Sequence, residues 1–201
     1  MVAEGSERLD IFSPEGKWLG TDTRASVHRL GLWHQTFHAW ITTVKPQGTY
    51  VWFQQRAQQK QQYPGLWDVT VAGHLLAGEE PYDGIREVHE ELGFAVPLTA
   101  CRYMSVEQDQ IHMPDFTDRE ICHVFQIALD LSAFGPRLNP DEVAAVGSVP
   151  LEEAIAWAMG AAPAMMIRVA ASGEAASVTF DDVVPHTTSY YVNTLKALAT
   201  M

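Results

Sequence analysis

The sequence has few cysteines and no long apolar run, and each absence excludes a class of protein. Cys101 and Cys122 are too few for a disulfide scaffold or a zinc cluster, and both stand in apolar segments where buried free thiols are expected. No apolar stretch reaches the ~18 residues of a membrane helix, and no signal peptide is recognisable. We therefore expect a cytoplasmic protein with no membrane partner.

Basic residues are also scarce. The chain has 13 Lys and Arg against 25 Asp and Glu, which gives a formal net charge of −12. This surplus disfavours nucleic acid and anionic membranes as bulk partners, because both repel an acidic surface. An acidic protein that acts on phosphates needs metal ions and a few local cations. With 47% hydrophobic residues, the 201 residues can bury one core, so we predict a single domain at 1–201.

What the sequence does have is a dense group of carboxylates in residues 73–94, GHLLAGEEPYDGIREVHEELGF. We predict a glycine loop that leads into a short helix, with Glu87, Glu90 and Glu91 on one face at i, i+3 and i+4. The opposite face is apolar and consists of Ile85, Val88 and Leu92. Like charges this close repel one another, and a divalent cation with oxygen ligands would compensate. A solvated acidic helix face is the alternative interpretation.

This segment resembles the Nudix box, in which a glycine, five residues, a glutamate and seven residues precede REUxEExGU, where U is aliphatic. The matching positions are Gly73, Glu79, Arg86, Glu87, Val88, Glu90, Glu91, Gly93 and the apolar Phe94. There is one departure: six residues, not seven, separate Glu79 from Arg86. Gly84 lies in this shortened stretch and costs a helix about 1 kcal/mol relative to Ala.

The similarity extends to the branch of the Nudix superfamily that includes isopentenyl diphosphate isomerase, and covers residues 8–158 in outline. The segments that carry it are 27–41, 53–60, 63–68 and 119–125. It implies an α/β (α+β) fold, the Nudix-type α/β/α sandwich around a mixed β-sheet. A C-terminal helical extension at about 160–201 is expected to follow.

Alternation and turn residues predict the other elements. The expected strands are 9–13, 18–21, 36–44, 50–55, 66–72, 98–106, 120–129 and 144–149. Helices are expected at 151–159 and 187–198. The remaining stretches are a frayed terminus at 1–6, a linking segment at 23–32, loops at 54–62 and 134–140, and an ambiguous segment at 160–178.

The resemblance implies a hydrolase that cleaves a diphosphate linkage in a small nucleotide or organic diphosphate. Its cofactor would be Mg²⁺, with Mn²⁺ as an alternative, because an all-oxygen site that retains several waters suits Mg²⁺. The implied metal ligands are Glu87, Glu90, Glu91 and the backbone carbonyl of Ala72. Arg86 would tether Glu79 and hold the loop against the helix.

The general base and the substrate contacts also follow from the resemblance. Glu120 aligns with the late catalytic carboxylate of the isomerase and is the first candidate for the base, and Glu87 is the alternative. Arg56 and Lys60 match positions that meet a diphosphate, although loop cations on an acidic protein are an equal alternative. His74 follows the glycine of the box and is expected beside the substrate.

Three histidines resemble part of a separate metal site in the isomerase. They are His28, His34 and His74, and Asp118 and Glu120 complete the set. Imidazole suits zinc or iron better than magnesium. Three interpretations stay open, namely a second metal, a relic of one, or histidines that only form hydrogen bonds.

Two other histidines have simpler interpretations. Alternation along the strand from residue 36 puts His38 on the opposite face from Phe37, Ala39 and Ile41, in a structural role. His89 is expected to face solvent on the helix of the box.

Two other functions stay open. A prenyl diphosphate isomerase needs a catalytic cysteine just before the Gly-His of the box, where this chain has Ala72, which cannot transfer a proton. A non-catalytic Nudix-like binding module fits the shortened loop but does not need every carboxylate of the box.

The organic part of the substrate and the formation of a homodimer cannot be read from the sequence. Aromatic candidates for the cleft or the core are Trp33, Trp40, Trp52 and Tyr63.

Overall fold

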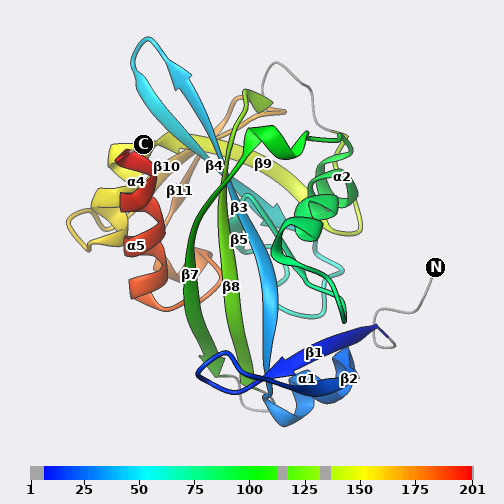
Figure 1. The fold of residues 1–201 in the computed structure, drawn as a ribbon. Coiled ribbons are helices and arrows are strands. Elements are labelled where there is room, and N and C mark those ends of the chain that lie inside the picture. Colours follow the sequence, from blue (N-terminus) through cyan, green and yellow to red (C-terminus); the bar gives the residue numbers. More distant parts are fainter. Residues whose placement is uncertain (1–6, 113–116, 132–136, 201) are drawn as a thin grey trace.

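The computed structural model describes residues 7–112, 117–131 and 137–200, and their elements form three layers (Figure 1). Eleven strands of these residues make one sheet. Helix α2 (Arg86–Leu92) covers one face, and α4 (Leu151–Ala158) and α5 (Thr188–Ala199) cover the other. The predicted α/β/α sandwich is confirmed. None of the described helices is long and apolar enough to span a membrane.

The sheet is organised around the long central strand β3 (Trp33–Lys45). One edge pairs in parallel with β8 (Thr117–Ala128), and His34 lies opposite Glu120. The other edge pairs in turn with β1 (Arg8–Phe12), β6 (Val71–His74) and β4 (Gly48–Arg56), all antiparallel. Because β6 and β8 flank the same stretch of β3, residues far apart in the sequence meet there.

The other strands extend the sheet in both directions. β2 (Trp18–Thr23) pairs with β1, and β7 (Cys101–His112) pairs with β8. β4 continues to β9 (Val143–Pro150), β10 (Met165–Val169) and β11 (Ala175–Val178), and its opposite edge also holds the short β5 (Trp67–Val69). The short helices are α1 (Arg24–Leu30), η2 (Pro81–Ile85), η3 (Leu98–Ala100) and η4 (Phe180–Asp182).

Alternation along β3 divides the core into two parts. Phe37, Ala39 and Ile41 pack with Val88 and Leu92 of α2 on one face. The opposite face packs on α4 and α5 through Trp40, Trp157, Tyr190, Tyr191 and Leu195. The predicted division of β3 is therefore confirmed, and His38 lies on the α5 side. Trp33, Trp40 and Trp52 are all buried in the core.

The strand predicted at 66–72 is in fact two strands, because the chain changes partner within it. β5 pairs with β4, whereas β6 pairs with β3. Thr70 lies at the change, where its hydroxyl donates to the carbonyl of Trp52 and accepts the backbone N–H of Ile41. These two bonds satisfy the backbone where the ladder is interrupted. The continuous β-branched run concealed this break.

Two further predictions need correction. Residues 23–32, taken as a linker, contain α1, whose N-cap is Thr23 and whose C-cap is Gly31 in the left-handed conformation. The extension at 160–201 was predicted to be helical, but it first adds β10 and β11 to the sheet and only then forms α5. Met165 and Ile167 are fully buried while their neighbours are more exposed, which is a strand period.

The remaining predicted strands and helices are found with shifted ends. The largest shift affects 98–106, where η3 comes first and β7 continues to residue 112. The predicted frayed terminus at 1–6, and the part of the predicted loop that covers 134–136, lie outside the described residues.

Gly84 has a packing role that its helix propensity conceals. η2 lies so close to β3 that a Cβ on Gly84 would be 2.4 Å from Cβ of Phe37. Neither backbone can move easily, because β3 is paired on both edges. This close approach brings the box helix down onto the sheet.

We therefore predict that Gly84→Ala destabilises the protein, although Ala favours helices. Overpacking of this kind costs roughly 1–3 kcal/mol in the free energy of unfolding, which exceeds the propensity gain of about 1 kcal/mol. Denaturant unfolding of the variant and the wild type measures the difference. An unfolding free energy equal to or above that of the wild type would contradict this packing argument.

Candidate active site

A cavity of about 270 Å³ lies between the box helix, the loop after β4 and the ends of β3, β6 and β8. Nine of the ten residues predicted for the site line it, namely Arg56, Lys60, Ala72, His74, Arg86, Glu87, Glu90, Glu91 and Glu120. The tenth, Glu79, lies against Arg86 instead. The fold thus gathers residues from five segments of the sequence around one space.

Arg86 joins the glycine loop to the box helix. Its Nε and Nη2 donate to the two carboxylate oxygens of Glu79 at 2.9 and 3.1 Å, and Nη2 also donates to the carbonyl of His74 at 2.9 Å. The same carboxylate accepts the backbone N–H of Leu76 at 2.8 Å. The loop that is one residue short therefore still brings Glu79 into a two-pronged pair with Arg86.

Glu87 and Glu91 present carboxylates to the cavity from successive turns of α2. Gly73 makes room for Glu87, because a Cβ there would lie 2.1 Å from the Glu87 carboxyl carbon. Glu91 is 5% exposed and accepts a hydrogen bond from Nε2 of Gln54 at 3.3 Å. Burial, opposed by Arg86 and reinforced by Glu90, raises the pKa of Glu87 to about 7. Burial and the neighbouring Glu87 raise the pKa of Glu91 well above its usual value.

This donor set suits a hard divalent cation. Burial penalises both charged carboxylates, and a cation between them would reverse that penalty. The candidate oxygens are those of Glu87 and Glu91, together with the predicted carbonyl of Ala72, a residue that lines the same cavity, and oxygen ligands are what Mg²⁺ or Mn²⁺ takes. Glu90 differs from the other two, because its side chain is 52% exposed and bonds Nη1 of Arg86 at 3.2 Å.

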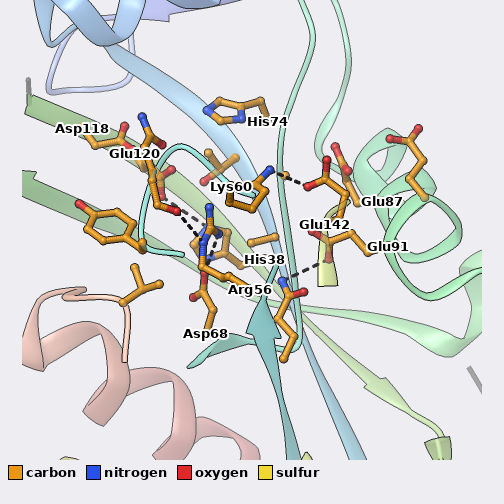
Figure 2. A pocket seen from close by; sticks show the side chains of 18 of the residues that line it. His38, Arg56, Lys60, Asp68, His74, Glu87, Glu91, Asp118, Glu120 and Glu142 are labelled. Atoms are coloured by element: carbon orange, nitrogen blue, oxygen red, sulfur yellow. Dashed lines mark hydrogen bonds and ion pairs between the residues drawn. The ribbon is translucent and has the colours of Figure 1, made fainter. Parts of the chain in front are cut away.

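Two cations lie between two groups of carboxylates in the cavity (Figure 2). Arg56 donates from Nη1 to Asp68 at 3.2 Å and from Nε to the carbonyl of Gln62 at 3.2 Å. Lys60 donates to Glu142 at 2.6 Å. One carboxylate group is Glu87, Glu91 and Glu142, and the other is Asp118 and Glu120. Both cations are therefore held by carboxylates inside the cavity and do not extend as free loop residues.

The three histidines form a cluster beside the second carboxylate group. Nε2 of His28 lies 3.0 Å from Nε2 of His74, and Nε2 of His34 lies 3.6 Å from Oδ1 of Asp118. Burial lowers the pKa of His28 to about 4 and those of His34 and His74 as well, so all three rings are neutral. Their ligand atoms lie within 4.8 Å of one another, which metal coordination and hydrogen bonding would both explain.

Asp118 and Glu120 differ in charge although they lie two residues apart. Burial and the charge of Glu120 raise the pKa of Asp118 well above its usual range. Burial would do the same to Glu120, but hydrogen bonding to His38 holds its pKa below the usual range. Two buried carboxylates this close cannot both ionise readily, and Glu120 is the one that stays charged.

Comparison with known proteins agrees with this geometry. The model of the NUDIX domain matches residues 33–168. The chain belongs to the Nudix family. An uncharacterised Nudix hydrolase from Clostridium acetobutylicum is 31% identical over 199 residues, which cover 96% of this chain and 97% of that protein. Nudix enzymes hydrolyse diphosphate linkages and typically use divalent metals.

The resemblance to the isomerase branch of the Nudix family is also confirmed. An isopentenyl-diphosphate delta-isomerase from Streptomyces griseus is 28% identical over 151 residues, which cover 72% of each chain. The crystal structure of a Deinococcus radiodurans protein matches with a TM-score of 0.56 at 23% identity, over 85% of this chain and 93% of that one. This structural likeness concerns the fold alone.

Sequence reasoning missed His186, which lies beyond the Nudix match and lines the cavity. Its side chain is 5% exposed, with Nδ1 2.6 Å from Asp109 and Nε2 3.0 Å from Asp68. Burial opposes the charge, but these two carboxylates raise the pKa of His186 to about 10. The imidazolium therefore bridges β5, β7 and the start of α5, and it also reaches Arg56 through Asp68.

No spacing in the sequence links these three residues, since 41 positions separate Asp68 from Asp109 and 77 more separate Asp109 from His186. The one local signal was Asp68, which lies in the predicted strand 66–72, because Asp109 lies beyond the predicted strand 98–106. Gln54 and Glu142 were missed for the same reason. His89 faces solvent, as predicted.

The His186 ion pairs predict a pH dependence of stability. A histidine whose folded pKa is about 10 against an ordinary 6.5 stabilises the fold fully below pH 6.5 and loses that contribution as pH rises through 10. Across this window one proton changes the unfolding free energy by at most about 1.4 kcal/mol per pH unit. Denaturant unfolding from pH 6 to 10 should show the wild type exceeding His186→Gln most at low pH, with a gap that closes as pH rises.

His89→Gln is the matched control, because it removes an exposed histidine. Its unfolding free energy should run parallel to that of the wild type over the whole range. A His186→Gln curve that also ran parallel would show that the imidazolium contributes no pH-dependent stability.

Proposed function

We propose that the protein is a Mg²⁺-dependent hydrolase of a diphosphate linkage in a small nucleotide or organic diphosphate, with Mn²⁺ as an alternative cofactor. The observation that carries this proposal is the pair of buried carboxylates Glu87 and Glu91 on one wall of a cavity that also contains Arg56 and Lys60. This combination supplies both metal ligands and phosphate-binding cations in a single space.

In this proposal Arg56 and Lys60 bind the diphosphate. A guanidinium has five N–H donors, so Arg56 can bind a phosphate oxygen while it keeps its bond to Asp68. Lys60 can share its ammonium between Glu142 and a second phosphate oxygen. The Asp68 and Glu142 pairs fix the two cations in advance, which reduces the entropy lost on binding.

Glu87, Glu91 and the Ala72 carbonyl would hold the cation, and Glu90 would stand at the rim. When bound, Mg²⁺ neutralises phosphate charge and lowers the pKa of an attached water. Arg86 keeps the loop and helix in register through Glu79, and it limits the rotation of Glu87 with a bond of 2.6 Å from Nη1. Arg86 and Glu79 thus position the ligands and do not themselves contact the substrate.

Glu120 is our candidate for the general base. It lines the cavity across from the box, and its lowered pKa leaves it as a carboxylate, the form that accepts a proton, although as a weaker base than an ordinary glutamate. Glu87 is the alternative, as the resemblance to the Nudix box implies. Glu120→Gln tests the first assignment, since a kcat equal to that of the wild type would exclude Glu120 as the base; Glu87→Gln should lose turnover under either assignment because Glu87 is also a proposed metal ligand.

The isomerase reading is less well supported. Ala72 lines the cavity where that chemistry requires a cysteine. The thiol of Cys122 lies 3.5 Å from Glu120, the candidate base. However, Cys122 is fully buried, and burial, reinforced by Glu120, raises its pKa well above the usual value, so it is inert as an acid or nucleophile.

We predict that Glu91→Gln loses Mg²⁺-dependent turnover by about 100-fold or more, because the neutral amide cannot supply the charge that a metal ligand needs. The assay is phosphate and pyrophosphate release from a panel of nucleoside and prenyl diphosphates, with Mg²⁺ and with EDTA. In EDTA the variant should melt at the same temperature as the wild type or higher, since a buried charge is removed.

Glu152→Gln is the control for this substitution, because it makes the same chemical change on the exposed side of α4. Its turnover should equal that of the wild type. Full activity of Glu91→Gln would rule out the box as the metal site. A folded wild type that binds a diphosphate but turns over none would favour the binding module.

A further inference from the structure

Tyr190 of α5 places its hydroxyl next to the candidate active site, from a part of the chain beyond the Nudix match. The residue is 1% exposed, and its hydroxyl lies 2.7 Å from Nδ1 of His38 on β3. Burial raises the pKa of Tyr190 well above its usual value, so the hydroxyl keeps its proton. The ring packs edge-on against the imidazole, with centroids 5.4 Å apart.

The other nitrogen of His38 faces the candidate base. Nε2 of His38 lies 3.4 Å from Oε2 of Glu120, and both side chains line the cavity. An ionised Glu120 can only accept, so Nε2 must carry a proton. With the hydrogen of the ring on Nε2, Nδ1 has a lone pair and accepts from the Tyr190 hydroxyl. The three groups therefore form one directed chain, in which Tyr190 donates to His38 and His38 donates to Glu120.

We propose that Tyr190 is a positioning residue that, through its hydrogen bond to Nδ1 of His38, fixes the orientation of the imidazole and so holds the Glu120 carboxylate in its place on the cavity wall. The inference rests on the proposed function and on Glu120 as its base. It gives His38 a role in the site, where the strand pattern alone indicated a structural one.

The groups around Glu120 explain why its carboxylate needs a positioned hydrogen-bond donor. Asp118 on β8 and Asp109 on β7 have carboxyl oxygens within 4.8 Å of it, but among the described residues neither makes a hydrogen bond to it. The thiol of Cys122, at 3.5 Å, is a weak donor. The N–H of His38, at 3.4 Å, is therefore the nitrogen donor that faces this carboxylate, and the orientation of its ring depends on what bonds Nδ1.

Tyr191 provides a matched control in the same helix. It is fully buried like Tyr190, and its hydroxyl makes one bond of 2.8 Å to the carbonyl of Val184. Each Tyr→Phe change removes one buried hydroxyl and keeps the ring in the core. The two variants should lose similar stability, so a difference in activity between them reports on His38 and Glu120 alone.

The test measures kcat and KM of wild type, Tyr190→Phe and Tyr191→Phe on the diphosphate that the panel identifies. We expect Tyr190→Phe to lower kcat about 10-fold with KM changed less than about 2-fold, because one positioning hydrogen bond is lost and the phosphate contacts are not. Tyr191→Phe should keep both constants within about 2-fold of wild type. Equal kcat values for the two variants would overturn the proposal.

A second measurement does not depend on the substrate. ¹⁵N NMR of the imidazole nitrogens of His38 should show the proton on Nε2 in all three proteins, with an Nδ1 signal that shifts in Tyr190→Phe, where its hydrogen bond is lost, and stays in place in Tyr191→Phe. Unchanged His38 signals in Tyr190→Phe would also overturn the proposal. If the wild type hydrolyses no diphosphate, the proposed function fails, while these signals still show whether Tyr190 controls His38.

Discussion

The carboxylates around the cavity repel one another, and much of the surrounding structure compensates for that repulsion. Eight acidic side chains line the cavity, namely Glu7, Asp68, Glu87, Glu90, Glu91, Asp118, Glu120 and Glu142, and Asp109 lies behind them beside Glu120. Leaving several buried charges unpaired would cost more than the stability of a typical domain. Two features reduce this cost, namely fixed cations that pair with carboxylates and the protonation of some carboxyl groups. In the proposed function a bound metal ion is the third.

These features lie in different parts of the cavity. Near the box, Arg86 and Lys60 pair with Glu87 and Glu142, and the raised pKa of Glu91 reflects what remains uncompensated. At the other end, the His186 imidazolium lies between two aspartates. The residual charge near the box is what the proposed cation would compensate. At the second end His186 balances Asp68 and Asp109, and Asp118 instead holds its proton.

The sequence was most informative where the chemistry is local. The spacing of Glu87 and Glu91 and the REUxEExGU pattern predicted the box, and the structure places both carboxylates on the cavity. A helix face is decided within a few residues, so periodicity captures it. The alternation in β3 was equally readable, which is why His38 could be assigned to the correct face.

The remainder of the site depends on strand pairing, which no local pattern encodes. His34 and Glu120 meet because β3 and β8 pair in parallel, 86 positions apart. The change of partner at Thr70 turns one predicted strand into two, so that Asp68 on β5 pairs with β4 while Ala72 on β6 pairs with β3. Gly84 is a further example. It is required by the close approach of η2 to Phe37, and helix propensity does not reveal a contact between distant residues.

The residues after the Nudix match belong to this arrangement as fully as the box does. His186 supplies the charge that lets Asp68 and Asp109 remain ionised in the interior, and Asp68 in turn holds Arg56. Tyr190, one turn further into α5, reaches His38. A segment that first adds two strands to the sheet therefore ends by completing the cavity from the side opposite the box. The box presents carboxylates on one wall of the cavity, and the C-terminal segment contacts the groups that face them.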